Sequence, residues 1–165
     1  MKTATILSIT LAFAATHAQL AAADTPKKDP TAAAAAAATK EIEAAFGFVP
    51  GFIRAIPKVV LPSWWEGTKA LEMNPNTALD GKTKELIGLA VAAQIPCEYC
   101  VYFHTEAAKL EGASEEEVQE AVAMASATRA GSTILNGLQV DKVQFKKDVD
   151  RIVKGAKKAQ PHARK

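Results

Sequence analysis

Residues 85–104 read ELIGLAVAAQIPCEYCVYFH, and this stretch decides the fold and the chemistry that the sequence predicts. Its first half is apolar nearly all round, which is typical of a buried helix, and Asp80 just upstream can cap that helix. Pro96 can start a second helix directly afterwards. Cys97, the first of the chain's only two cysteines, then falls in the first turn of the second helix, and Cys100 follows one turn later.

On such a helix Cys97, Cys100 and His104 share one stripe about 60° wide, because each residue advances by about 100°. Small or apolar side chains flank this stripe, namely Val101, Ala107 and Ala108. The side chains expected to face water lie on the other side, namely Glu98, Tyr102, Thr105 and Lys109. The sequence therefore predicts that two thiols and an imidazole point into the protein, beside small side chains that leave room for a substrate.

The spacing of the two cysteines suits redox exchange better than structural reinforcement. A disulfide between Cys97 and Cys100 would close a loop of only four residues, so it would stabilise the fold by about 2 kcal/mol or less. Covalent haem attachment needs a histidine directly after the second cysteine, and this chain has Val101 there. A structural zinc site needs four ligands, of which Cys97, Cys100 and His104 supply three. A plain structural disulfide and a zinc site stay open as alternatives, and no cofactor is expected.

Glu85 and His104 are the candidate proton carriers. His104 lies one helical turn after Cys100, close enough to take a proton from its thiol. Glu85 is the only charged residue in its apolar helix segment, and a buried carboxylate needs a partner. A purely structural Glu85 is equally compatible with the sequence, either complementing the helix dipole or pairing with Lys82 or Lys84.

The rest of the sequence predicts an all-α chain, because no stretch alternates in the way of a strand. Thr31 can cap an alanine-rich helix that Gly47 ends, and Ser114 with Glu117 forms a capping box. The expected helices cover residues 31–46, 80–94, 96–112 and 114–136, with further helices beginning at about 63 and at 141. The adjacent Trp64 and Trp65 fit a core or a subunit interface better than a binding wall.

Residues 1–23 have the pattern of a secretory signal peptide, with Lys2 near the start, an apolar stretch and then small residues. Cleavage is expected after Ala23 or after Ala18. The apolar stretch is too short for a membrane-spanning helix, which needs about 20 residues. We therefore expect a periplasmic or secreted protein that is not held in the membrane. The expected organisation is a signal peptide over 1–23, a linker and alanine-rich helix over 24–46, a helical domain over 47–158 and a basic tail over 159–165.

Composition agrees with a soluble globular protein, since 48% of the residues are hydrophobic and 23% are charged. The net charge of +2 gives no reason to expect a nucleic-acid partner. The basic C-terminal end has no interleaved aromatic residues for base stacking, so it is interpreted as a solvated helix and tail.

The order Glu85, eleven residues, then C-x-x-C-x-x-x-H resembles the alkylhydroperoxidase D branch of the carboxymuconolactone decarboxylase superfamily. The resemblance covers about residues 48–137 and includes GFVPGFIRAIP and LPSWWEGTKAL upstream. It implies an all-α helical bundle that assembles as a homotrimer or homohexamer and reduces hydroperoxides through its cysteine pair. It also implies that Cys100 attacks the peroxide, that Cys97 resolves the sulfenic acid as a disulfide, and that His104 and Glu85 carry protons.

Tyr99 departs from the family pattern. The best-studied peroxidases of this branch have a histidine just before the second cysteine, so the resemblance does not carry that part of a proton relay over to this chain. The decarboxylases of the superfamily lack the cysteine pair, which makes decarboxylation the weaker expectation here.

The functional expectation is an exported thiol-dependent peroxidase with a hydroperoxide substrate and an unidentified thiol reductant, for which a thioredoxin-like protein is one candidate. A thiol–disulfide oxidoreductase without peroxidase activity is the alternative enzyme. A non-catalytic assembly protein with a local cysteine clasp is the alternative outside enzymes.

Overall fold

The computed structural model describes residues 29–159, which form helices joined by turns and contain no strand. This confirms the all-α prediction for the part of the chain that is described, whereas the expected oligomer stays a prediction. The signal-peptide expectation lies outside the described residues. None of the described helices is both long and apolar enough to cross a bilayer.

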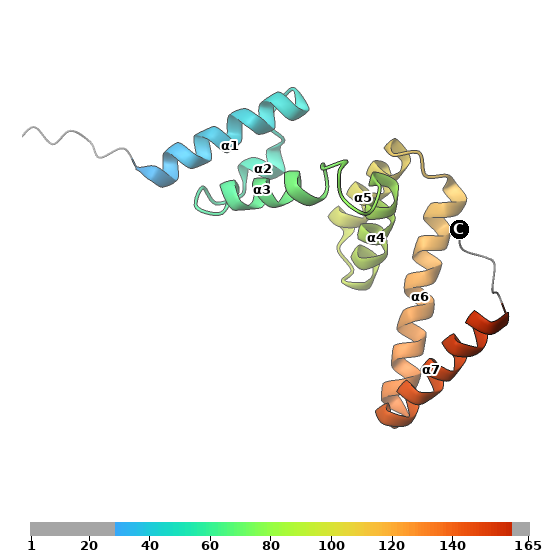
Figure 1. Ribbon diagram of the computed structural model, residues 1–165. Coiled ribbons are helices and arrows are strands. Elements are labelled where there is room, and N and C mark those ends of the chain that lie inside the picture. The colour runs from blue at the N-terminus through green and yellow to red at the C-terminus, as the bar shows by residue number, and fades with distance from the viewer. Residues whose placement is uncertain (1–28, 160–165) are drawn as a thin grey trace, which may run out of the picture. The chain divides into compact units, whose positions relative to one another are not determined.

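The described residues form two compact units, 29–65 and 66–159. The first contains α1 (Pro30–Phe46), α2 (Gly51–Arg54) and the beginning of α3 (Leu61–Leu71), labelled in Figure 1. Its core consists of Ala38, Ile42, Ile53, Leu61 and Trp65. The alanine-rich helix thus packs with α2 and the start of α3, because Ala38 and Ile42 lie on one face of it and are buried there.

The prediction that Trp65 belongs to the core is confirmed. Only 1% of it is exposed, and its indole Nε1–H donates to Glu41 Oε2 at 2.9 Å, so its one polar atom is satisfied. The neighbouring Trp64 is partly exposed and stacks against Trp65 with ring centroids 6.5 Å apart.

The first helix begins earlier than the sequence suggested. Asp29, rather than Thr31, is its N-cap and accepts a hydrogen bond from the Thr31 backbone N–H at 2.9 Å. The prediction that Thr31 caps is wrong by two residues because Pro30 takes the first helical position, for which its fixed φ is suited. Gly47 ends the helix as expected, with a left-handed φ of 77°.

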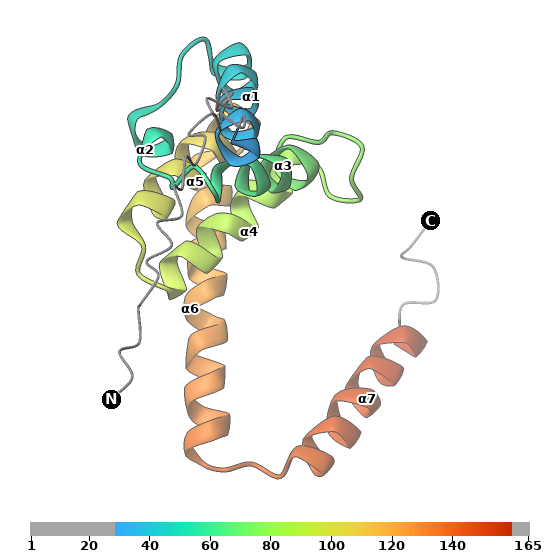
Figure 2. The same ribbon diagram turned by 90° about the vertical axis from the view of Figure 1, so that its left-hand side faces the viewer.

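The second unit holds α4 (Gly81–Gln94), α5 (Glu98–Leu110), α6 (Glu115–Gly137) and α7 (Lys142–Ala159). Helix α4 packs against both α5 and α6, as Figure 2 shows. Leu89 and Ala92 of α4 are buried in this packing, as is Ala108 of α5. The end of α4 is linked to α6 by Arg129, whose Nε donates to Gln94 Oε1 at 2.6 Å.

The caps that the sequence predicted for these helices are confirmed. Asp80 accepts a hydrogen bond from the Thr83 N–H at 2.7 Å and starts α4. Ser114 and Glu117 form the reciprocal capping box that starts α6.

The prediction that the apolar segment of α4 is buried all round is wrong. Ile87, Val91 and Ile95 follow one another at every fourth position, and about half or more of each side chain is exposed. Helices α5 and α6 cover the other sides of α4, so this stripe is left as an open apolar face.

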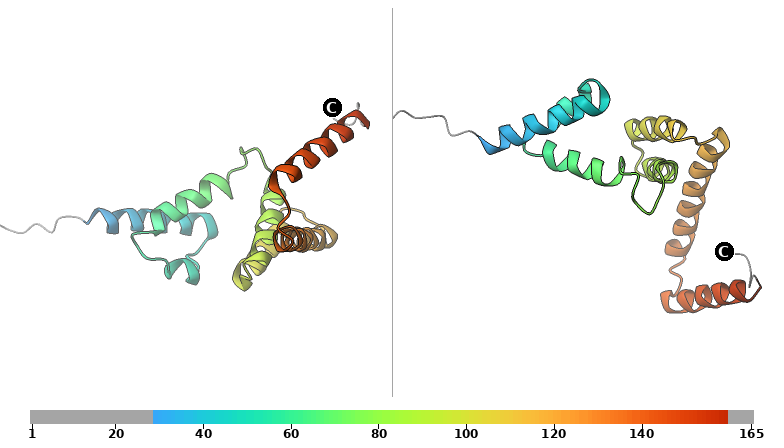
Figure 3. Two further views of the ribbon diagram at one scale, coloured as in Figure 1. Left: turned by 90° about the horizontal axis from the view of Figure 1, so that it is seen from below. Right: turned by 45° about the horizontal axis from the view of Figure 1, so that its top comes forward.

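Helix α7 is amphipathic and has no buried residue. Within the second unit no other helix lies along it, and it diverges from the end of α6 in Figures 2 and 3. Its apolar side chains, among them Phe145, Val149 and Ile152, are therefore exposed on one side of a helix rich in lysine.

Candidate active site

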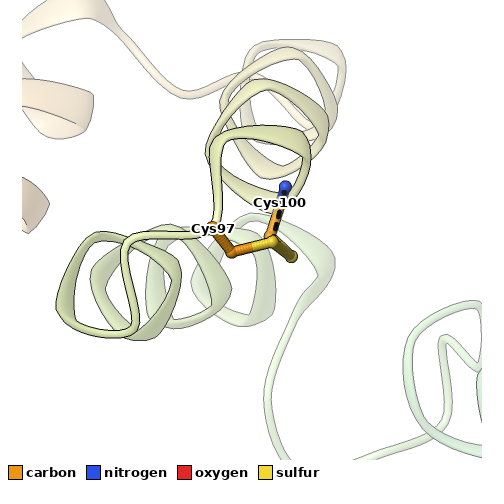
Figure 4. Close-up of a disulfide and its surroundings, with 2 residues drawn as sticks. All are labelled: Cys97 and Cys100. Atoms are coloured by element: carbon orange, nitrogen blue, oxygen red, sulfur yellow. Dashed lines mark hydrogen bonds between the residues drawn. A yellow bond between two sulfur atoms is a disulfide. The ribbon is translucent and has the colours of Figure 1, made fainter.

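The two cysteines lie where the turn after α4 enters α5, and they are joined by a disulfide (Figure 4). Helix α5 begins at Glu98, so the prediction of a helix from Pro96 with Cys97 in its first turn is wrong. Cys97 has extended backbone angles and serves as the N-cap, with its Sγ accepting from the Cys100 N–H at 3.2 Å. Cysteine can take this position because its sulfur is a weak acceptor placed where a serine oxygen would be.

The backbone N–H directed at Cys97 Sγ has a chemical consequence once the disulfide is reduced. A thiolate at a helix N-terminus is favoured by that N–H and by the helix dipole. Cys100 lies in the first turn of α5 and shares part of this effect. The structure therefore brings both sulfurs to a location that suits thiolate chemistry.

His104 and Glu85 are brought together across α5 and α4. The His104 Nδ1 lies 2.7 Å from Glu85 Oε2, and only 7% of Glu85 is exposed. The partners considered for a structural Glu85 are engaged elsewhere, since Lys82 Nζ lies 2.7 Å from Glu117 Oε1 and Lys84 Nζ donates to the Asn74 carbonyl at 2.8 Å. Glu85 thus orients the imidazole.

The bond to Glu85 fixes which nitrogen of His104 can serve the cysteines. Because Nδ1 is engaged, Nε2 is the atom through which the ring can exchange a proton with Cys100 one turn earlier. His104 and Cys100 are both half-buried, as the predicted stripe required. Cys97 precedes the helix and so is not part of that helical stripe. The disulfide nevertheless holds it beside Cys100.

The residues beside the cysteines lie largely where the sequence placed them. Ala108 is buried, and Val101 and Ala107 are half-buried. Of the side chains expected to face water, Glu98, Tyr102 and Lys109 are exposed, whereas Thr105 is half-buried. Tyr99 is 90% exposed and so takes no part in a relay within the site.

Gly88 of α4 is a site residue that the sequence analysis missed. A Cβ added to it would lie 2.5 Å from His104 Nδ1 and 2.6 Å from Cε1, so the imidazole ring rests against the helix backbone at this position. Only glycine leaves that space, and a glycine inside an otherwise apolar helix was the signal that could have indicated a close approach.

A pocket of about 350 Å³ opens beside the disulfide. Its apolar wall includes the exposed stripe of α4, and its polar lining includes Cys100, His104 and Glu85. The other lining residues are Leu71, Glu72, Leu79, Lys84, Gly88 and Ala92. The pocket therefore combines an apolar surface with one sulfur of the disulfide and the imidazole–carboxylate pair.

Glu72 is the second site residue that sequence analysis missed. Its side chain is exposed and lines the rim of the pocket, where partial burial raises the pKa of its carboxyl, the negative charge of Glu85 raises it further, and His104 opposes both. Nothing in the local sequence marks it, since it stands between Leu71 and Met73 directly after α3.

Metal binding has no further support in the described residues. Over residues 29–159 no three His, Cys, Asp or Glu side chains are grouped as a metal site requires. The two sulfurs of the zinc alternative are bonded to one another.

Comparisons with protein families and solved structures identify the family to which the chain belongs. The model of the carboxymuconolactone decarboxylase family matches residues 61–142. The crystal structure of the alkylhydroperoxidase AhpD core from Rhodospirillum rubrum is 27% identical in sequence, with a TM-score of 0.59 over 70% of this chain and 88% of that one. The chain belongs to the carboxymuconolactone decarboxylase superfamily. Within it, the chain lies in the alkylhydroperoxidase D-like branch, which confirms the resemblance found from Glu85 and the cysteine motif.

A curated relative is uncharacterized protein 4 in the cox locus of Paracoccus denitrificans. It is 44% identical over 55 residues, which amount to 33% of this chain and 50% of that protein. The match thus spans half the length of the relative.

Proposed function

We propose that this member of the superfamily is a thiol-dependent peroxidase that reduces hydroperoxides through Cys97 and Cys100. The observation that carries the proposal is the hydrogen bond of 2.7 Å between Glu85 and His104 in the same pocket as the disulfide. An oriented imidazole one turn from a cysteine is the arrangement that activates a thiol as nucleophile.

The proposed reaction begins with the reduced protein. His104 takes the thiol proton of Cys100, and the thiolate attacks the terminal oxygen of the hydroperoxide. The O–O bond breaks, an alcohol leaves after gaining one proton, and Cys100 becomes a sulfenic acid. The Cys97 thiol then attacks the Cys100 sulfur, which releases water and forms the disulfide. One hydroperoxide and two thiols are thereby converted into one alcohol, one water and one disulfide.

Two effects compete over which cysteine attacks. The helix N-terminus favours thiolate at Cys97 by about 0.3–1 kcal/mol. A histidine within reach of Cys100 can lower the pKa of a thiol by several units, as in other cysteine–histidine pairs. The larger effect assigns the attack on peroxide to Cys100 and the resolving role to Cys97.

Steady-state assays with the mature protein and dithiothreitol test the activity. The proposal predicts consumption of organic hydroperoxide or hydrogen peroxide that depends on both cysteines. A second candidate function, thiol–disulfide exchange without peroxidase activity, is favoured by the N–H that would stabilise a thiolate at Cys97. Exchange with a disulfide substrate in the absence of peroxide turnover would favour that candidate.

Export and partners are proposed on the sequence. The signal pattern of residues 1–23 implies that the mature protein starts near Asp24 or Gln19 and works in the periplasm or outside the cell. The reductant there would be a thioredoxin-like protein. The intact mass of protein from the native host tests this, and a cytoplasmic form that keeps residues 1–23 would contradict it.

A further inference from the structure

The pocket contains a carboxyl group that the steps above do not use. Glu72 lines the pocket together with Cys100, His104 and Glu85, but it comes from a different segment. It directly follows Leu71, the last residue of α3, whereas the other three groups come from α4 and α5. The pocket therefore holds two carboxyl groups with different surroundings.

The surroundings of the two carboxyl groups suit different roles. Glu85 is buried and hydrogen-bonded to His104, which holds it as a partner of the imidazole. Glu72 lies at the C-terminal end of a helix, where the carbonyl dipoles disfavour a negative charge. The Glu72 side chain is exposed, and the partial burial of its carboxyl together with the charge of Glu85 raises its pKa, although His104 opposes this. Paired carboxyl groups with such different surroundings commonly divide into a base and an acid.

The chemistry of peroxide reduction requires an acid at a defined place. When a thiolate attacks the terminal oxygen, the leaving oxygen departs in line with the new S–O bond and therefore on the side away from the sulfur. His104 lies on the same helix as Cys100 and has just taken the proton of its thiol. The imidazole is therefore on the side of the attacking sulfur. The departing alkoxide needs a proton from another segment of the pocket.

We propose that Glu72 is the general acid that protonates the departing alkoxide, an assignment that rests on the proposed peroxidase function. The O–H bond of the Glu72 carboxyl breaks as the O–O bond of the hydroperoxide breaks, and the proton goes to the alkoxide to give the alcohol. Glu72 is left as a carboxylate and regains its proton from water before the next cycle. No further oxidant or reductant enters the step.

The other groups near the pocket are less suited to this role. Lys84 also lines it, but the ammonium group donates to the Asn74 carbonyl at 2.8 Å. Tyr99, at the position of the family's histidine, is 90% exposed and is not among the residues that line the pocket. Of the two carboxyl groups of the pocket lining, Glu85 is bonded to His104, which leaves Glu72 as the candidate acid.

The test compares Glu72→Gln with wild type in peroxide turnover as a function of pH. Glutamine has nearly the same shape and cannot donate this proton, so we expect turnover to fall by about 10- to 100-fold at the wild-type optimum. We also expect wild-type turnover to fall as the pH rises through the pKa of Glu72, because the acid then loses its proton, and this fall should be absent from Glu72→Gln. Glu72→Asp should restore part of the rate and the fall of turnover with rising pH. Glu106→Gln, at an exposed position on α5, is the matched control and should behave as wild type.

The structural integrity of Glu72→Gln is checked by the melting temperature and the circular dichroism spectrum, which should match wild type. Turnover of Glu72→Gln within about twofold of wild type, or an unchanged pH profile, would overturn the role. A large loss in Lys84→Met with Glu72→Gln unaffected would assign the acid to lysine and overturn it as well. Wild type is assayed first. If it consumes no hydroperoxide, the proposed peroxidase function itself fails, and this outcome is distinct from a failure of the role of Glu72.

Discussion

The close contact between Gly88 and His104 leads to a specific prediction for the variant Gly88→Ala. In Gly88→Ala the new methyl group would lie 2.5 Å from the His104 Nδ1, whereas ordinary contacts begin at about 3.4 Å. The His104 side chain of α5 lies directly against the backbone of α4 at Gly88, so the ring would have to move by roughly 1 Å to relieve this overlap. That displacement breaks the bond of 2.7 Å to Glu85.

Two energies of opposite sign determine the stability of Gly88→Ala. Replacing a helical glycine by alanine stabilises by about 0.8–1 kcal/mol through helix propensity. Losing a hydrogen bond to a charged group, with the buried Glu85 left without it, costs about 1.5–3 kcal/mol. We therefore expect a net loss of about 0.5–2 kcal/mol in urea unfolding. Peroxide turnover should fall by about 10²-fold, because a catalytic group misplaced by about 1 Å loses that much.

Gly131→Ala in α6 is the matched control. A Cβ at that position meets no atom within 4 Å, so the variant should gain the propensity term and keep full activity. The His104 ring signals should shift in Gly88→Ala and stay unchanged in the control. A Gly88→Ala protein that is more stable than wild type, fully active and unchanged in its His104 signals would refute the close approach and the role that it gives the imidazole.

Three further predictions address the site and the assembly. Glu85→Gln should lower peroxide turnover by about 10²-fold with an unchanged circular dichroism spectrum, and equal activity would leave Glu85 a structural role only. Cys97→Ser should accumulate a sulfenic acid at Cys100 that dimedone traps, and Cys100→Ser should show almost no fast labelling; mass spectrometry that finds fast labelling only at Cys97 would reverse the assignment. Because the apolar side of α7 is uncovered within its unit, we expect copies of the chain to meet there, so Val149→Asp combined with Ile152→Asp should reduce the mass in sedimentation; an unchanged mass would remove α7 from the interface.

Features set by local chemistry were predicted well from the sequence. The caps at Asp80 and Ser114 depend on a side chain and a backbone N–H within three residues, so the sequence pattern contains all of their causes. The spacing from Glu85 through the cysteines to His104 was equally informative, since two packed helices bring these residues together.

Features that depend on tertiary contacts were missed. The uncovered stripe of α4 looks like any buried apolar run, because composition does not tell which sides neighbouring helices cover. Glu72 lines the pocket only because the chain after α3 passes beside it. Gly88 is a site residue only because the His104 ring lies against its backbone. The start of α5 was misplaced because the sequence pattern did not show that Cys97 takes extended angles and caps the helix with its sulfur.

The most direct test of the central claim is a single turnover of fully reduced mature protein with one equivalent of organic hydroperoxide. The proposed mechanism predicts that one equivalent of alcohol forms while both thiols disappear into the Cys97–Cys100 disulfide, which peptide mapping identifies. The reaction should be fast compared with that of free dithiothreitol, because His104 activates the attacking thiol. Recovery of the hydroperoxide with both thiols intact, on the time scale in which dithiothreitol alone reacts, would contradict the claim that this site is a peroxidase.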